Sequence, residues 1–333
     1  MKSLSIAVFA LFQAAGVPAT EAPVSALKQV ATIPLPGVEG RIDHMNWAGY
    51  SNVLFIAARD YGTVEQISLV QNKVGKPFLG PRAPQGLASA SGMIFATDGR
   101  RGRVWAFPIE WDILLPDWHS KHTDIGPDAD NIRFLRSSWT LLVGYGDGAL
   151  GSMSVPELEV QFRIELGGHP ESFQLDSAEK QVWVNVPSKQ GIAVVDLEAK
   201  KVARWIELKT AKQNYPMALA EKDKRLLVGC REPARLLVFD IETDAMTAEL
   251  PLSGDVDDIF VDEERGFVYA SCGEGFVDVF ERAKPGEWKL KEKVATSPGA
   301  RTCLFVPSEK KLFVAVPHRG EQQAEVRVFS TAP

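Results

Sequence analysis

Polar side chains with acid, base or metal-binding chemistry stand about ten positions ahead of a series of regularly spaced apolar runs. The residue types differ from one instance to the next, whereas the polar character is common to all seven. Repeats that use such residues only to satisfy backbone groups tend to keep one residue type, so we favour a functional pocket over structural bracing. The candidates are Arg41, Asp43, His44, Gln85, Asp128, Asp130, Asn131, His169, Glu171, Asn214, Tyr215, Asp255, Asp257, Asp258 and Arg301.

Two kinds of ligand fit these residue types. Several carboxylate and amide oxygens suit a hard divalent cation such as Ca²⁺, and the candidate ligands are Asp130, Asn131, Glu171, Asn214 and Asp257. Alternatively, two guanidinium groups side by side bind a carboxylate or phosphate, and the chain offers Arg41 and Arg301 for this, with His44 nearby. Turns after the apolar runs add further candidates to the pocket wall, namely Arg231 and His318.

The apolar runs themselves recur with a period in the forties. They start near Leu54, Ile94, Leu141, Val182, Leu226, Phe267 and Leu312, at spacings of 40, 47, 41, 44, 41 and 45 residues. Each run is short, rich in Val, Ile and aromatic residues, and bounded by Gly, Pro or charged turns, which is the pattern of a β-strand. Four such strands per repeat make one antiparallel blade, so the chain is predicted to form an all-β, seven-bladed propeller.

The last repeat, from Pro298 to Phe329, contains only three strands, and one unassigned strand at 30–35 precedes the first repeat. We therefore expect the early strand to complete the last blade and close the ring, which leaves no free sheet edge. Residues 25–331 are then one domain. The longest spacing reflects an insertion from Trp111 to Lys121, expected to protrude between blades two and three.

The first 22 residues have the pattern of a secretory signal peptide, with Lys2 before an apolar core at 6–12 and small residues after it. We therefore expect a periplasmic or secreted protein.

The net charge of −6 without a basic run argues against nucleic acid as a partner, and the apolar stretches are shorter than a membrane span requires. Cys230, Cys272 and Cys303 are odd in number, and buried, unpaired thiols are favoured over a bridge between the first two.

The repeats resemble the bacterial YVTN-type, YncE-like family of exported seven-bladed propellers. The segments that carry this resemblance are 226–231, 267–271 and 312–316, together with strands that end in Val-Val-Asp at 194–196 and Val-Phe-Asp at 238–240. Similar propellers include metal-dependent lactonases related to gluconolactonase, whose central ion is held by Glu, Asn and Asp. Glu171, Asn214 and Asp257 match these residue types.

The sequence favours a propeller that binds a small molecule or a protein partner over the polar rim and carries out no reaction. The alternative is a hydrolase or lactonase in which a central divalent cation polarises a carbonyl group, and Asp257 or Asp43 is the base.

Overall fold

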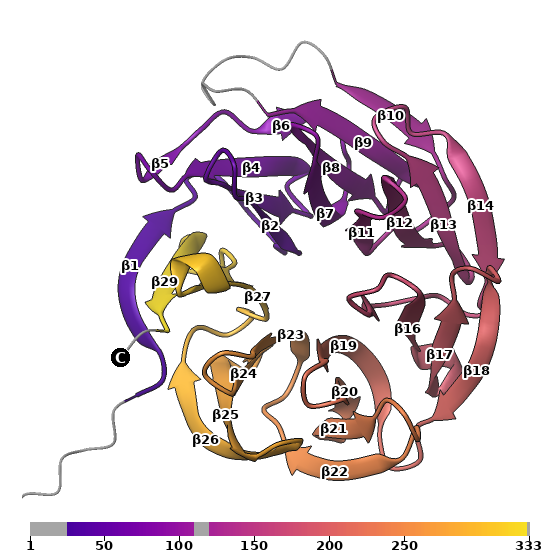
Figure 1. The fold of residues 1–333 in the computed structure, drawn as a ribbon. Coiled ribbons are helices and arrows are strands. Elements are labelled where there is room, and N and C mark those ends of the chain that lie inside the picture. Colours follow the sequence, from indigo (N-terminus) through magenta and orange to yellow (C-terminus); the bar gives the residue numbers. More distant parts are fainter. Residues whose placement is uncertain (1–24, 110–119, 332–333) are drawn as a thin grey trace, which may run out of the picture.

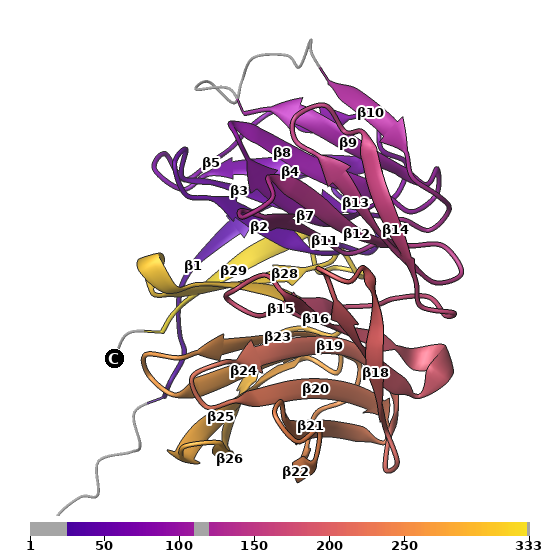
Figure 2. The ribbon, with the colours of Figure 1, turned by 45° about the vertical axis from the view of Figure 1, so that its right-hand side comes forward.

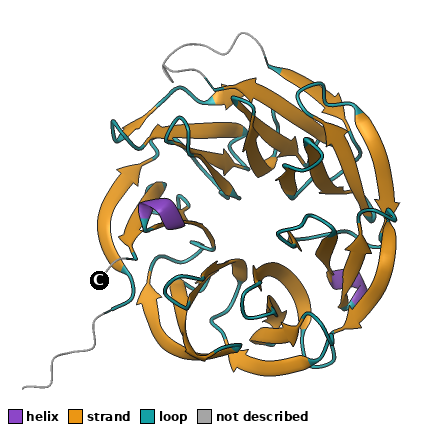
Figure 3. Ribbon diagram, viewed as in Figure 1, coloured by secondary structure: helices purple, strands orange, loops and turns teal. Residues whose placement is uncertain are grey.

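Seven antiparallel sheets stand side by side around one axis in the computed structural model, which describes residues 25–109 and 120–331 (Figure 1). Strands make up nearly all of the regular structure, and the two helical segments are single 3₁₀ turns, η1 (Pro187–Lys189) and η2 (Pro307–Glu309) (Figure 3). The predicted seven-bladed propeller is confirmed. Each predicted second strand begins within one residue of its expected start.

In the first four blades the strands follow one another from the axis outwards. Blade one is β2 (Met45–Ala48), β3 (Val53–Ala58), β4 (Thr63–Ser68) and a split outer strand, β5 (Lys73–Val74) with β6 (Phe78–Leu79); blade two is β7 (Pro84–Ala90), β8 (Met93–Asp98), β9 (Arg103–Pro108) and β10 (Lys121–Asp124); blade three is β11 (Ile132–Leu135), β12 (Thr140–Tyr145), β13 (Ala149–Ser154) and β14 (Val160–Glu165); blade four is β15 (Phe173–Leu175), β16 (Gln181–Val186), β17 (Gly191–Asp196) and β18 (Lys201–Glu207).

The last three blades keep the same order, and the final outer position is taken by the first strand of the chain. Blade five is β19 (Lys212–Ala220), β20 (Arg225–Glu232), β21 (Ala234–Asp240) and β22 (Met246–Pro251); blade six is β23 (Val256–Asp262), β24 (Phe267–Cys272), β25 (Phe276–Lys284) and β26 (Glu287–Ala295); blade seven is β27 (Thr302–Val306), β28 (Lys311–Val316), β29 (Glu325–Ser330) and β1 (Lys28–Pro34).

The ring is closed by pairing between the two ends of the described chain. β1 pairs antiparallel with β29 from Lys28 opposite Ser330 to Pro34 opposite Glu325. Ile33 and Leu35 then pack with Phe313 and Val326 of blade seven and with Leu54 of blade one. The expected closure is therefore confirmed, and in Figure 1 the indigo β1 lies against the yellow β29.

The hydrophobic core lies between blades rather than within one layer. Each of the seven core clusters joins two neighbouring blades, and the cluster around Leu54 and Phe313 joins the last blade to the first. Middle strands such as β3, buried at every residue, contact a blade on either side. Outer strands such as β18 mostly alternate exposed and less exposed residues, because successive side chains point to opposite faces of the sheet and one face is open to solvent. This difference explains the continuous apolar runs of the middle strands.

The insertion lies inside blade two, which corrects its expected place between blades two and three. It joins β9 to β10, and β10 pairs with β9 as the outer strand of the same sheet. Most of the insertion lies within residues 110–119, which are outside the described residues, as is the proposed signal peptide at 1–22.

None of the helices among the described residues has the length and apolar character to cross a membrane. Cys230, Cys272 and Cys303 are buried free thiols, as expected.

Candidate functional site

The loops that lead into the innermost strands all open on one face of the ring, because the four strands of each blade alternate in direction. We call this the lead-in face. The turns between second and third strands lie on the same face, and the other turns lie on the opposite face. β2, β7, β11, β19, β23 and β27 surround the axis in Figure 1. The loops that carry the sequence-predicted polar residues therefore converge on one mouth.

Asp257 at the start of β23 is the hub of an ion-pair network. The Arg231 guanidinium donates through Nη2 to Asp257 Oδ1, and Arg301 Nε lies 3.3 Å and Arg41 Nη2 3.6 Å from Asp257 Oδ2. Arg301 Nη1 also donates to both oxygens of Asp255 at 3.0 Å. Arg41 and Arg301 come from the lead-in loops of blades one and seven, and Arg231 comes from β20 of blade five, so the network with Asp257 of blade six joins four consecutive blades.

His44 lies between two carboxylates. Its Nδ1 is 3.3 Å from Asp258 Oδ1 and its Nε2 is 3.8 Å from Asp43 Oδ1. Burial lowers the pKa of the imidazole, but Asp258 and Asp43 raise it more, and the pKa is about 10. His44 is therefore a cation at neutral pH, and it acts here as a fixed positive charge rather than as a base near pH 7.

On the other side of the axis, neither Asp130 nor Glu171 forms an ion pair with an arginine among the residues that the structure describes. The neighbours of Asp130 include His169 Nε2, 4.0 Å from its Oδ2, and the same nitrogen lies 3.7 Å from Asp128. Burial and then the charge of Glu171 raise the pKa of Asp130 to about 8, and burial and then the charge of Asp257 raise the pKa of Glu171 to about 7. The site is thus divided into an arginine-rich side and a side with two carboxyl groups that hold protons near neutral pH.

A pocket of about 260 Å³ opens at the arginine-rich side, between blades seven and one. Arg41 and Arg301 line it together with two residues of the turn after β28, His318 and Arg319, and Asp60 is the carboxylate in its wall. Within residues 25–109 and 120–331, no carboxylate pairs with the Arg319 or His318 side chain. Arg41 Nε is buried and has no hydrogen-bond partner among the same residues.

Four other predicted residues brace the mouth rather than face the pocket. Asn214 is fully buried and donates to Asn185 Oδ1 at 2.8 Å and to the Gly191 carbonyl at 3.1 Å. Gln85 accepts from Arg59 Nε at 2.8 Å and donates to the Ala129 carbonyl. The remaining two are Asn131, which is buried and lies 3.5 Å from Arg133 Nη1, and Tyr215, whose ring lies 4.2 Å from the Arg231 guanidinium carbon.

The sequence analysis did not select Arg133, which lies on the innermost strand of blade three. Its guanidinium carbon is 5.3 Å from the Phe173 ring of blade four, and its Nη1 donates to the Ile132 carbonyl at 2.9 Å. The available signal was a charged residue between apolar neighbours, Ile132 and Phe134, on a strand next to the axis. Arg319 follows the predicted His318 in the turn after β28, and its place in the pocket depends on how blades seven and one meet.

No protein-family model matches the chain, and neither does any curated protein sequence. Solved structures match in fold. A chain of hydrazine synthase from Kuenenia stuttgartiensis superposes with a TM-score of 0.70 at 13% identity, over 84% of this chain and 95% of that one. A chain of the mitotic checkpoint complex superposes with a TM-score of 0.76 at 10% identity, over 99% of both chains. Likenesses at this identity establish the propeller fold and leave function to the site.

Proposed function

We propose that the protein is an exported propeller that binds a small anionic molecule at the lead-in face and carries out no reaction on it. The observation that carries this proposal is the pocket in which Arg41, Arg301, His318 and Arg319 meet. An arginine without a carboxylate partner and a buried guanidinium N–H without an acceptor are both satisfied by carboxylate or phosphate oxygens. Membership of the YVTN-type family stays a prediction that rests on the strand-and-turn segments.

The size and charge of the pocket define the part of the ligand that it takes. A volume of about 260 Å³ accommodates one acid group with a few carbon atoms, and the rest of a larger ligand would extend over the channel mouth. That part of the ligand would lie near Asp130 and Glu171, which hold protons near neutral pH and are able to donate hydrogen bonds to it. A protein partner that presents an acidic side chain at this face would use the same contacts.

Isothermal titration of the purified protein with inorganic phosphate and with citrate tests this function. We expect at least one of the two to bind, and Arg319→Gln to weaken that binding at least tenfold, since charge-assisted hydrogen bonds contribute about 1.5–3 kcal/mol. Arg163→Gln, on the outer strand of blade three and 51% exposed, is the matched control and should leave the affinity unchanged. Failure of both anions to bind, or equal affinity in Arg319→Gln and the control, contradicts the proposal.

A divalent cation at Glu171, Asn214 and Asp257 stays the alternative prediction, and the charges around Asp257 disfavour it. Three guanidinium groups lie within 3.6 Å of that carboxylate and would repel a cation. Asn214 Oδ1 is buried, has no hydrogen-bond partner among the described residues and keeps a lone pair for a ligand. The side-chain Nδ2 of Asn214, however, donates to Asn185 Oδ1 of blade four, which fixes the orientation of the amide. Within the described part of the chain, no cluster of three or more His, Cys, Asp or Glu side chains is arranged to hold a metal.

One observation favours a hydrolytic role as the second candidate. Asp130 and Glu171 have pKa values of about 8 and about 7, which is the range of a general acid or base at neutral pH. They replace Asp43 and Asp257 as candidates for the base, because arginines hold both of those carboxylates. Hydrolysis of a lactone by the purified protein, lost in Glu171→Gln while phosphate still binds, would favour this candidate.

A further inference from the structure

A second cleft lies on the face opposite the lead-in loops, between blades three and four. Its volume is about 600 Å³, within the usual range for small-molecule sites. The turns β11–β12, β15–β16 and β17–β18 contribute to it, together with β13 and β14. The outer strands β14 and β18 are in contact at this junction and follow one another along the outer rim of the ring (Figure 1, Figure 2). None of the residues of the lead-in site lines this cleft.

Contacts between the two blades hold the walls of the cleft in place. The Glu179 carboxylate of blade four accepts hydrogen bonds from the backbone N–H groups of Arg136, at 2.9 Å, and Ser137, at 2.8 Å, in blade three. Leu135 and Leu197 line the cleft and belong to the core cluster that joins these blades. The cleft therefore has an apolar base and a wall fixed by hydrogen bonds, rather than two free loops.

Ser152 supplies a polar atom that the protein leaves unsatisfied. Its side chain lines the cleft and is 1% exposed, and its Oγ has no hydrogen-bond partner among the described residues. A buried hydroxyl without a partner is costly, so such groups are rare without a function. A hydroxyl or carbonyl group of a bound molecule would complete the hydrogen bonding of Ser152.

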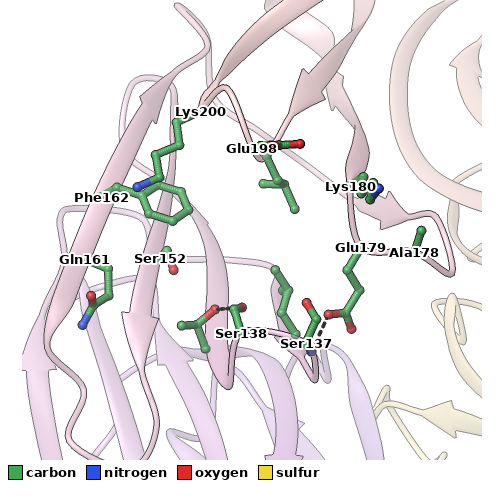
Figure 4. A pocket seen from close by; sticks show the side chains of 13 residues that line it. Ser137, Ser138, Ser152, Gln161, Phe162, Ala178, Glu179, Lys180, Glu198 and Lys200 are labelled. Atoms are coloured by element: carbon green, nitrogen blue, oxygen red, sulfur yellow. Dashed lines mark hydrogen bonds between the residues drawn. The ribbon is translucent and has the colours of Figure 1, made fainter.

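The remaining lining side chains define the chemistry of that molecule. Figure 4 shows Gln161 and Phe162 on one side of the cleft and Glu179 and Lys180 on the other. Five of the lining residues carry a hydroxyl or an amide group, two lysines are matched by two glutamates, and no arginine lines the cleft, unlike the lead-in pocket. The hydroxyl and amide residues are Ser137, Ser138, Thr140, Ser152 and Gln161.

The geometry points to a second ligand site in this cleft, which takes an uncharged polyhydroxylated molecule such as a short saccharide. Side-chain hydroxyls and an amide act as donors and acceptors for sugar hydroxyls. Leu135 and Leu197 supply apolar groups at the base of the cleft, and Phe162, with the Lys200 ammonium 4.7 Å from its ring centre, lies in the wall. The balanced lysine and glutamate charges give no preference for an acid or an amine. This inference does not rest on anion binding at the lead-in face.

Isothermal titration with maltose, cellobiose, sucrose and trehalose tests the inference on the wild-type protein and on two variants. We expect at least one saccharide to bind and Ser152→Ala to weaken it about tenfold, because one hydrogen bond to a buried hydroxyl is lost. Thr331→Val is the matched control, since it removes another buried, unpartnered hydroxyl far from the cleft, and it should leave the affinity unchanged.

Two outcomes would overturn the inference: none of the four saccharides binds, or Ser152→Ala binds as tightly as Thr331→Val. Tighter binding of glucose 6-phosphate than of the uncharged saccharides would overturn the assigned ligand class if that binding takes place in the cleft. Titration of Arg319→Gln, which alters only the lead-in pocket, checks this: binding in the cleft remains intact in that variant. Both substitutions remove an unsatisfied polar atom, so both variants are expected to fold, and urea unfolding of each checks this.

Discussion

Arg231→Gln should lower the free energy of unfolding by about 3 kcal/mol at pH 7, because it leaves a buried carboxylate without its main counter-charge. Arg231 contacts Asp257 through Nη2, lies 3.3 Å from Asp255 through Nη1, and donates to the Val256 carbonyl at 2.9 Å. Its guanidinium also stacks on Tyr215. Burial raises the pKa of Asp257 and the charge of Arg231 lowers it, so removal of the arginine leaves the ionised carboxylate less stable.

Urea unfolding of Arg231→Gln beside Arg103→Gln measures this effect. Arg103 pairs with Asp124, which is 74% exposed, and exposed ion pairs contribute at most about 1 kcal/mol. We expect the Arg103 variant to unfold close to the wild type. Losses of similar size in the two variants would show that the network around Asp257 does not stabilise the fold.

Asp130→Asn should make the protein more stable than the wild type at pH 9, by a margin about 4 kcal/mol larger than at pH 5. In the folded protein the pKa of Asp130 is raised from 3.8 to about 8. A raised carboxyl pKa contributes stability that is fully present below the unfolded value, near pH 4, and is lost as the pH rises through 8. The amide of Asn keeps the uncharged form at every pH, so the variant avoids this loss.

The wild type should accordingly lose stability between pH 5 and pH 9. Glu171, with a pKa of about 7, acts in the same direction. The raised pKa of His44 adds to the loss above pH 6.5, where the unfolded chain has given up the imidazole proton and the folded protein still holds it, and this loss is complete near pH 10. Urea unfolding across this range, with Asp124→Asn as an exposed control, provides the measurement. A wild-type profile that is flat, or parallel to that of Asp130→Asn, would contradict the raised pKa.

The fold was predictable because its signals are local. Strand alternation, turns and a period in the forties are visible within each repeat, and the missing strand of the last repeat predicted the pairing of β1 with β29. The insertion was misplaced because residues 121–124 are polar and 4 residues long, a weak strand signal that becomes an outer strand only by pairing with β9.

The sequence predicted which polar residues come close together at the site, but not which partner each of them contacts. Convergence of the lead-in loops follows from the topology, and it brings Arg41, Asp257 and Arg301 together. Whether a polar residue faces the mouth or a neighbouring blade depends on the rotation between blades, which sequence does not contain. For this reason the sequence did not predict that Asn214 donates a hydrogen bond to Asn185 of the neighbouring blade. The cleft at Ser152 had no signal, because its walls come from turns that share no motif.

Anomalous diffraction from crystals soaked in selenate tests the central claim most directly, since selenium locates an anion without assumptions about the natural ligand. We expect a selenium peak within hydrogen-bond distance of Arg319, in the pocket that Arg41, Arg301 and His318 also line. Absence of a peak there, while selenate occupies other arginine-containing sites of the same crystals, would contradict it.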